Sequence, residues 1–174
     1  MNTLPHWWQN GVIYQIYPKS FQDTTGSGTG DLRGVTQRLD YLKTLGIDAI
    51  WLTPFYISPQ IDNGYDVANY IAIDPAYGTL DDFDELVAQA HARGIRIVLD
   101  MVFNHTSTQH AWFRESLKKE SPYRQFYIWR DGEPETPPNN WRSKFGGSAW
   151  RWHAESEQYY LHLFAPEQAD LNWE

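Results

Sequence analysis

The sequence lacks cysteine altogether, so neither a disulfide nor a cysteine-ligated metal can hold the fold. Positive charge is also scarce: 14 Lys and Arg stand against 22 Asp and Glu, a net charge of −8 with a pI near 5.1. This balance excludes nucleic acid and anionic membrane as the main partner, because both bind basic surfaces. Residues 1–11 have neither the basic nor the long apolar segment of a signal peptide, and no apolar run is long enough to span a membrane. We therefore expect a cytoplasmic protein.

Aromatic residues, in contrast, are abundant: they make up 16% of the chain and include nine Trp. This content indicates either a binding surface for half-apolar ligands such as sugars, or dense aromatic packing in a small loop-rich domain. With 41% hydrophobic and 21% charged residues, the 174-residue chain has the composition of a folded protein rather than a disordered one.

Short apolar runs alternate with helical patterns in residues 12–99. The runs 12–17, 49–52 and 95–99 are predicted to be strands, and residues 35–46 and 79–94 to be helices. Gly46 is predicted to end the first helix, and Thr79 with Asp82 to start the second as a capping box. This order predicts a parallel α/β sheet. A complete barrel of eight strands needs about 250 residues, so the sheet is either small and open or part of a barrel.

Polar residues follow the third predicted strand, with Asp100, Asn104 and His105 in the segment DMVFNH. The carboxyl ends of parallel strands are where α/β proteins place ligands, so these residues are candidates for a site. The structural alternative is that Asp100 caps a turn and His105 is a hydrogen-bonded loop residue.

Residues 107–174 combine many aromatics with turn-forming pairs, and residues 160–164 alternate as in a strand. We expect a loop-rich subdomain with a small antiparallel sheet.

Several segments together resemble the α-amylase superfamily, glycoside hydrolase family 13. They are DNGYD (62–66), DMVFNH (100–105), NNWRSKFGGSAW (139–150) and QADLN (168–172). Within the family they are most similar to the α-glucosidase branch, which includes oligo-1,6-glucosidases, dextran glucosidases and trehalose-6-phosphate hydrolases. The resemblance implies the N-terminal part of a (β/α)8 TIM barrel, with its first three strands in residues 1–104. It also implies that residues 105–174 form domain B, an insertion after the third strand.

The resemblance also implies an activity. The full-length protein is expected to be a retaining α-glucosidase of carbohydrate metabolism that hydrolyses trehalose 6-phosphate, a small sugar substrate. The alternatives are an oligo-1,6-glucosidase, another α-glucosidase of the branch, or a non-catalytic carbohydrate-binding relative. The family places its nucleophile and acid/base carboxylates after later strands, beyond Glu174. No catalytic residue is therefore assigned within this chain, and residues 1–174 alone are expected to be inactive.

Family motifs also imply substrate-binding positions. Asp62 is expected to hold hydroxyls of the non-reducing glucose, Tyr65 to stack on its ring, and His105 to hydrogen-bond near the 6-hydroxyl. Phe145 and Phe164 resemble the aromatics at the entrance of the site.

A further four positions carry weaker implications. Gln168 resembles a residue that reaches the substrate, although for Gln168, as for the two entrance aromatics, packing within domain B is an equal alternative. The motif residues expected to hold domain B against the barrel are Asp100, Asn104 and Asp170.

The loop 23–31 resembles a calcium-binding loop of the same branch. Its ligand positions hold Asp23, Thr25, Ser27, Thr29 (through the carbonyl) and Asp31. Hydroxyls replace two of the usual donors, so binding of Ca²⁺ or Mg²⁺ is expected to be weak, and an ordered turn around water is the alternative. No cofactor is expected to be required for the chemistry.

Overall fold

The structure is a computed structural model that describes residues 6–174. The chain divides into two compact units. The first comprises the residues up to Phe55 together with Ala72–Met101, and the second comprises Tyr56–Ile71 together with Val102–Glu174. The later part of the second unit begins at Val102, and the unit also includes residues 56–71, which belong to a stretch predicted to be a loop. The expected domain B boundary at residue 105 stays a prediction.

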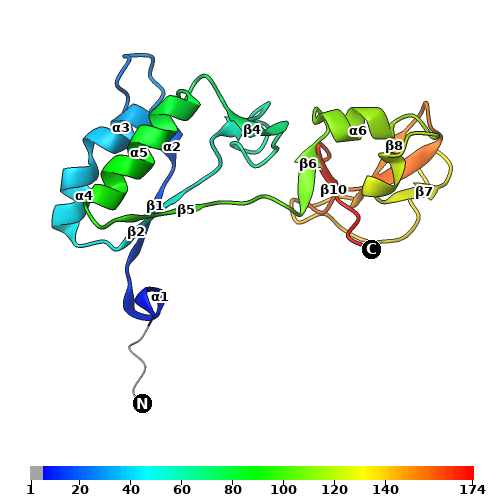
Figure 1. Ribbon diagram of the computed structural model, residues 1–174. Helices are drawn as coiled ribbons and strands as arrows, with labels where there is room; N and C mark the ends of the chain where they lie inside the picture. The colour runs from blue at the N-terminus through cyan, green and yellow to red at the C-terminus, as the bar shows by residue number, and fades with distance from the viewer. Residues whose placement is uncertain (1–5) are drawn as a thin grey trace. The chain divides into compact units, whose positions relative to one another are not determined.

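A parallel three-stranded sheet forms the centre of the first unit (Figure 1). Its strands β1 (Ile13–Ile16), β2 (Ala49–Leu52) and β5 (Arg96–Leu99) lie in that order, with Ile13 beside Ala49 and Ala49 beside Arg96. The predicted α/β class and parallel sheet are confirmed. The register places the first residues of the three strands side by side.

Four of the described helices pack on this sheet through apolar side chains. They are α2 (Pro18–Phe21), α3 (Leu32–Gln37), α4 (Leu39–Leu45) and α5 (Leu80–Ala92). The short helix α1 (Trp7–Asn10) precedes the sheet and has no buried residue. The core between sheet and helices includes fully buried Leu39, Leu42, Ile50, Leu86 and Ile95.

The first predicted helix is broken into α3 and α4 at Arg38, whose side chain donates to Gln22 Oε1 at 2.7 and 2.9 Å. It also begins earlier than the apolar pattern indicated, because Asp31 caps α3 by accepting a hydrogen bond from the Gly34 N–H at 2.7 Å. Gly46 follows α4 with φ of +85°, which confirms the predicted helix end.

The predicted capping box at the start of α5 is confirmed. Thr79 Oγ1 accepts from the Asp82 N–H at 3.2 Å, and Asp82 Oδ2 accepts from the Thr79 N–H at 2.8 Å. The other oxygen of Asp82 pairs with Arg33 Nε at 2.6 Å, which ties α3 to α5. One carboxylate therefore both caps a helix and connects two helices.

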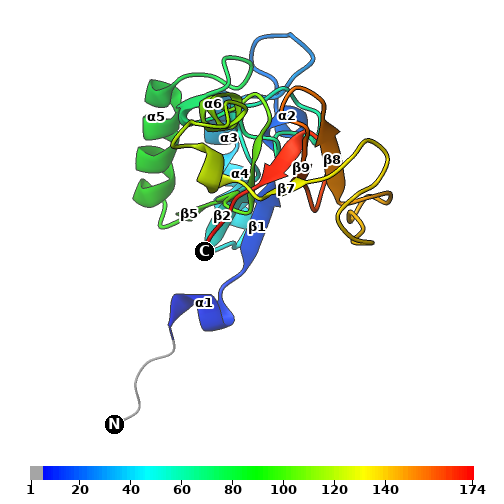
Figure 2. The same ribbon diagram turned by 90° about the vertical axis from the view of Figure 1, so that its right-hand side faces the viewer.

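Two small antiparallel sheets and several short elements make up the second unit. Strand β6 (His105–Ser107) pairs with β10 (Gln168–Asp170), and β9 (Gln158–Leu161) lies between β7 (Trp129–Asp131) and β8 (Trp150–His153) (Figure 2). The remaining elements are β3 (Tyr56–Ile57), β4 (Asn69–Ile73), α6 (Ala111–Ser116) and the 3-10 helix η1 (Arg124–Phe126).

The strand expected at residues 160–164 is displaced toward the N-terminus, since β9 ends at Leu161. Beyond it, the His162 N–H donates to the Ala149 carbonyl and the Leu163 carbonyl accepts from the Lys144 N–H, both at 2.8 Å. His162 and Leu163 thus pair with the loop before β8, whereas Tyr160 and Leu161 pair within the sheet, and the pattern alone could not distinguish these partners.

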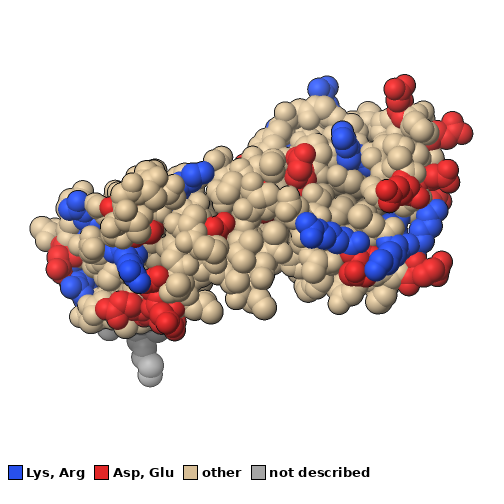
Figure 3. Space-filling model, turned by 90° about the horizontal axis from the view of Figure 1, so that it is seen from above, with Lys and Arg blue, Asp and Glu red and all other residues tan. Residues whose placement is uncertain are grey.

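The distribution of charged side chains and the lengths of the helices can be compared with what the composition indicated. On the face shown in Figure 3, Lys and Arg side chains lie among Asp and Glu side chains. Among residues 6–174, none of the helices combines the length and the apolar character that crossing a membrane requires.

The capping box gives a stability prediction. Thr79→Ala in the full-length protein should lower the free energy of unfolding by about 1 kcal/mol, because the Asp82 N–H loses its acceptor. Thr79→Ser keeps the hydroxyl and should retain most of the stability. Urea unfolding followed by circular dichroism measures both. Equal loss in the two variants would show that the methyl group of Thr79, rather than the cap, carries the effect.

Candidate active site

The pairing of β6 with β10 brings distant predicted site residues together. Asp170 lies opposite His105, and Gln168 lies opposite Ser107, in adjacent antiparallel strands. Gln168 is fully buried and His105 is 4% exposed. Two segments more than 60 residues apart in sequence therefore place polar side chains inside the second unit, where each must be hydrogen-bonded.

Gln168 is the centre of this network. Its Oε1 accepts from the Ala165 N–H at 2.8 Å, so its Nε2 must be the donor end of the amide. Nε2 donates to Asp62 Oδ2 at 3.0 Å and lies 3.0 Å from His105 Nε2. Three of the predicted substrate-binding residues, Asp62, His105 and Gln168, are thus in direct contact.

The hydrogen bonds of His105 define its tautomer. Nε2 lies 3.0 Å from the Tyr65 carbonyl, which only accepts, so this nitrogen carries the proton. Nδ1 lies 3.2 Å from Asn104 Nδ2, which also donates to Asp170 Oδ1 at 3.2 Å. Burial lowers the pKa of His105 against the opposing effect of the Tyr65 carbonyl. The residue is therefore a neutral imidazole whose Nε2–H and the Gln168 amide are neighbouring donors.

Asp62 is positioned by a turn that Asp66 holds. Asp66 is fully buried and accepts from Ser58 Oγ at 2.9 Å, the Ile61 N–H at 3.0 Å and the Asp62 N–H at 3.1 Å. The turn includes Asn63 at φ of +52°. Sequence reasoning missed Asp66. The available signal was a second Asp four residues after the first, a spacing at which a carboxylate can accept from the backbone of a turn.

The two predicted entrance aromatics, Phe164 and Phe145, form a chain of ring contacts that begins at His105. The Phe164 ring centroid lies 5.3 Å from that of His105, and the Phe145 centroid lies 5.9 Å from that of Phe164. Phe145 is 62% exposed, whereas Phe164 is half-buried. Both line a pocket of about 380 Å³ that also includes Arg151. The side chain of Tyr65 packs in an apolar cluster around Val67, and its carbonyl is the group that meets His105.

Asp170 is a buried acid supported by the same network. Its Oδ1 accepts from the Leu163 N–H at 3.0 Å and from Asn104 Nδ2. Burial raises the pKa of Asp170 more than these two hydrogen bonds lower it, and the pKa is about 6. Through Asn104 this carboxyl orients the Nδ1 side of His105.

Asp100 belongs to the first unit, where its N–H donates to the Leu52 carbonyl at 3.3 Å. The expected role of the three residues in holding domain B to the barrel stays a prediction.

The loop 23–31 is closed by its own hydrogen bonds. Asp23 accepts from the N–H groups of Thr25, Gly26 and Gly28 at 2.8–2.9 Å, and these bonds, that of Gly28 first, lower its pKa to about 2. Asp31 accepts from the Thr24 N–H and caps α3. A cation would share oxygens that already accept hydrogen bonds. No cluster of three or more His, Asp or Glu suited to a metal is found among residues 6–174. The expected Ca²⁺ or Mg²⁺ site stays a prediction.

The comparisons with known proteins identify the family of this chain. Residues 15–174 match the model of the alpha-amylase catalytic domain. The chain belongs to the alpha-amylase family. It is 90% identical to trehalose-6-phosphate hydrolase of Escherichia coli (strain K12) over 174 residues, which are the whole chain and 32% of that protein. Oligo-1,6-glucosidase of Heyndrickxia coagulans is 60% identical over 98% of the chain and 31% of that protein.

Solved structures of the alpha-amylase family superpose closely. The crystal structure of trehalose-6-phosphate hydrolase from Bacillus licheniformis has a TM-score of 0.92 and 61% identity, over 96% of this chain and 30% of that one. A mutant isomaltulose synthase from Erwinia rhapontici NX5, crystallised with D-glucose, has a TM-score of 0.94 and 55% identity, over 99% and 31% of the two chains. This chain therefore spans about a third of the length of its relatives.

The raised pKa of Asp170 gives a pH prediction. The folded state binds the Asp170 proton more tightly than the unfolded state, so this group stabilises the fold as pH falls from about 6 toward about 4. The lowered pKa of His105 acts in the opposite direction and favours the fold as pH rises through its unfolded value near 6.5. Asp170→Asn removes only the first effect. The Tm of the variant minus that of the wild type should therefore be more positive at pH 7.5 than at pH 4.5.

Thermal unfolding of the full-length protein at both pH values checks this expectation. Glu157→Gln is the matched control, because Glu157 is exposed and the substitution makes the same change of carboxylate to amide. A Tm difference for Asp170→Asn that does not vary with pH would contradict the raised pKa.

Proposed function

We propose that the full-length protein is a retaining α-glucosidase that hydrolyses trehalose 6-phosphate to glucose and glucose 6-phosphate. The observation that carries this proposal is the contact of Gln168 with Asp62 and His105, in a chain 90% identical to a trehalose-6-phosphate hydrolase. The two buried residues hold in place Asp62, a partly exposed carboxylate. A sugar hydroxyl can donate its proton to such a carboxylate.

Each group has a defined part in this binding. Asp62, which is partly exposed, would accept the hydroxyl proton, while the buried Gln168 holds its Oδ2 at 3.0 Å and is itself in contact with His105. Because His105 is neutral, it forms no ion pair that would occupy the Asp62 carboxylate. Interactions that hold the reacting sugar in the transition state raise kcat/KM. Phe145 and Phe164 would contact the second sugar where it enters.

The bond-breaking groups are proposed to lie outside residues 1–174. Retention requires a nucleophilic carboxylate and a proton donor about 5 Å apart on opposite sides of the anomeric carbon. Of the carboxylates in the network, Asp62 accepts from Gln168, Asp66 holds a turn, and Asp170 is supported by backbone and Asn104. None is free to serve as the nucleophile, so we propose that the segment alone is inactive.

A second candidate is an oligo-1,6-glucosidase, because such an enzyme is 60% identical to this chain. The two candidates differ in whether a phosphate is recognised. Arg151, which lines the pocket beside Phe145 and Phe164, is a candidate phosphate ligand, as are the neighbouring Arg142 and Lys144. Location in the cytoplasm is proposed with the same function, because a phosphorylated sugar is an intracellular substrate.

Kinetics of the full-length protein tests the function and the site together. We expect kcat/KM to be higher for trehalose 6-phosphate than for trehalose or isomaltose. Asp62→Ala should lower kcat/KM at least about 100-fold, because it removes the acceptor for the substrate hydroxyl. Asp84→Ala, the same change at an exposed position of α5, is the control. Preference for isomaltose would favour the oligo-1,6-glucosidase, and no hydrolysis at all would favour a non-catalytic relative.

The cation at loop 23–31 is proposed separately from this function. Asp23 is ionised throughout the neutral range, because its pKa is lowered to about 2, and it could therefore hold Ca²⁺ weakly. Millimolar calcium added to chelator-treated full-length protein should raise the Tm, and Asp23→Asn should abolish the rise. If the Tm does not respond, hydrogen bonds alone close the loop.

A further inference from the structure

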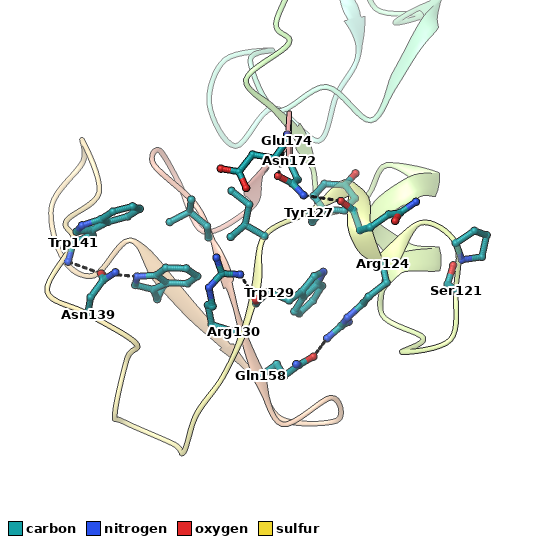
Figure 4. A pocket seen from close by; sticks show the side chains of 15 residues that line it. Ser121, Arg124, Tyr127, Trp129, Arg130, Asn139, Trp141, Gln158, Asn172 and Glu174 are labelled. Atoms are coloured by element: carbon teal, nitrogen blue, oxygen red, sulfur yellow. Dashed lines mark hydrogen bonds between the residues drawn. The ribbon is translucent and has the colours of Figure 1, made fainter.

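The second unit has another pocket, of about 630 Å³, which shares no residue with the Asp62–Gln168–His105 network (Figure 4). It lies at the β7–β9–β8 sheet and the loop that precedes β8. Its volume is within the range typical of small-molecule sites. The wall combines large aromatic rings with planar polar side chains. Those used below are Arg124, Trp129, Arg130, Asn139, Trp141 and Trp150.

One side of this pocket is a fixed aromatic platform. Trp141 is 55% exposed and stacks on the buried Trp150, with ring centroids 6.3 Å apart and an interplanar angle of 23°. Asn139 Oδ1 holds the pair by accepting from Trp150 Nε1 at 2.8 Å and from the Trp141 N–H at 3.0 Å. An exposed indole held in this way offers a flat apolar face at little cost in side-chain entropy.

The opposite side carries hydrogen-bond donors that lack acceptors. Arg130 extends into the pocket between Asn139 and Trp129 (Figure 4). Its Nη1 donates to the Trp129 carbonyl at 2.8 Å, whereas Nε and Nη2 bond to none of the described residues. The indole N–H of Trp129 is buried and has no partner within residues 6–174. Arg124 fixes that indole from its own side, with the guanidinium carbon 3.5 Å from the ring centroid.

A buried donor without an acceptor is unfavourable and uncommon, and the Trp129 N–H belongs to a residue that lines this pocket. Two free nitrogens of the exposed Arg130 lie in the same pocket as an exposed Trp held in one orientation. The ligand that satisfies both features has hydroxyl or ether oxygens at its edge and an apolar face of C–H groups. A hexopyranose has this construction, because its equatorial hydroxyls surround two faces that are largely C–H.

We propose that this pocket is a second carbohydrate-binding site, which binds a hexopyranose unit of an α-glucoside by stacking on Trp141 and by hydrogen bonds from Arg130. It binds sugar without taking part in hydrolysis. Its occupancy does not depend on Asp62, so the second site and the proposed function can succeed or fail separately.

Calorimetric titration of the full-length protein with trehalose tests the proposal. The Asp62→Ala variant silences the first site and should still bind trehalose at one site per chain. Adding Trp141→Ala to it should weaken that binding at least tenfold. The matched control adds Trp8→Ala, since Trp8 is 57% exposed and lies in the first unit, in α1.

Two results would overturn the second site: no trehalose binding by Asp62→Ala, or equal binding with and without Trp141. Should Trp141→Ala lower the Tm, Arg130→Ala replaces it, because this exposed side chain bonds only to its neighbour's carbonyl. Loss of binding with an unchanged Tm supports the proposal, and retained binding refutes it. The kcat/KM of Asp62→Ala, measured separately, decides the proposed function.

Discussion

The candidate site depends on one buried amide. Gln168 has no exposed surface, so its donor and acceptor ends must both find partners within the protein. The Ala165 N–H occupies the acceptor end, which leaves the donor end for Asp62. Because this orientation is fixed, His105 must direct its own proton to the Tyr65 carbonyl rather than to the Gln168 amide. The positions of Asp62 and His105, 43 residues apart in sequence, are therefore set by a third residue in a different strand.

Two titratable groups next to this amide are shifted toward their neutral forms. Burial raises the pKa of Asp170 and lowers that of His105, so each shift disfavours a charge. Asn104 lies between them and donates to Asp170 while it faces His105 Nδ1. A neutral imidazole keeps a single N–H at a defined nitrogen. The Tyr65 carbonyl accepts that N–H, so His105 positions its neighbours, a role that differs from that of a general acid, which must carry a transferable proton.

Local signals were sufficient for much of the first unit. The parallel strands, the capping box of Thr79 and Asp82, and the helix end at Gly46 follow from short-range apolar periodicity and backbone geometry. The second unit was harder, since its contacts connect residues far apart: Gln168 and Asp62 are separated by 106 positions. Asp66 was missed because its role is to accept backbone N–H groups of a turn, and no apolar pattern marks such a turn. The displaced β9 has the same origin, because loop 143–149 competes with a strand for the same backbone groups.

The contrast between the two polar regions of the second unit carries a further argument. Around Gln168 the buried donors and acceptors pair with one another, so the protein alone accounts for their arrangement. Around Trp129 the chain has supplied the aromatic platform and its Asn139 support, yet one buried N–H has no partner among the described residues and two nitrogens of the exposed Arg130 are free to donate to a ligand. Packing alone does not explain that difference, because an apolar residue in place of Trp129 would fill similar space without an unpaired donor. The free nitrogens of Arg130 are the part of this pocket that fits the oxygen atoms of the proposed sugar ligand.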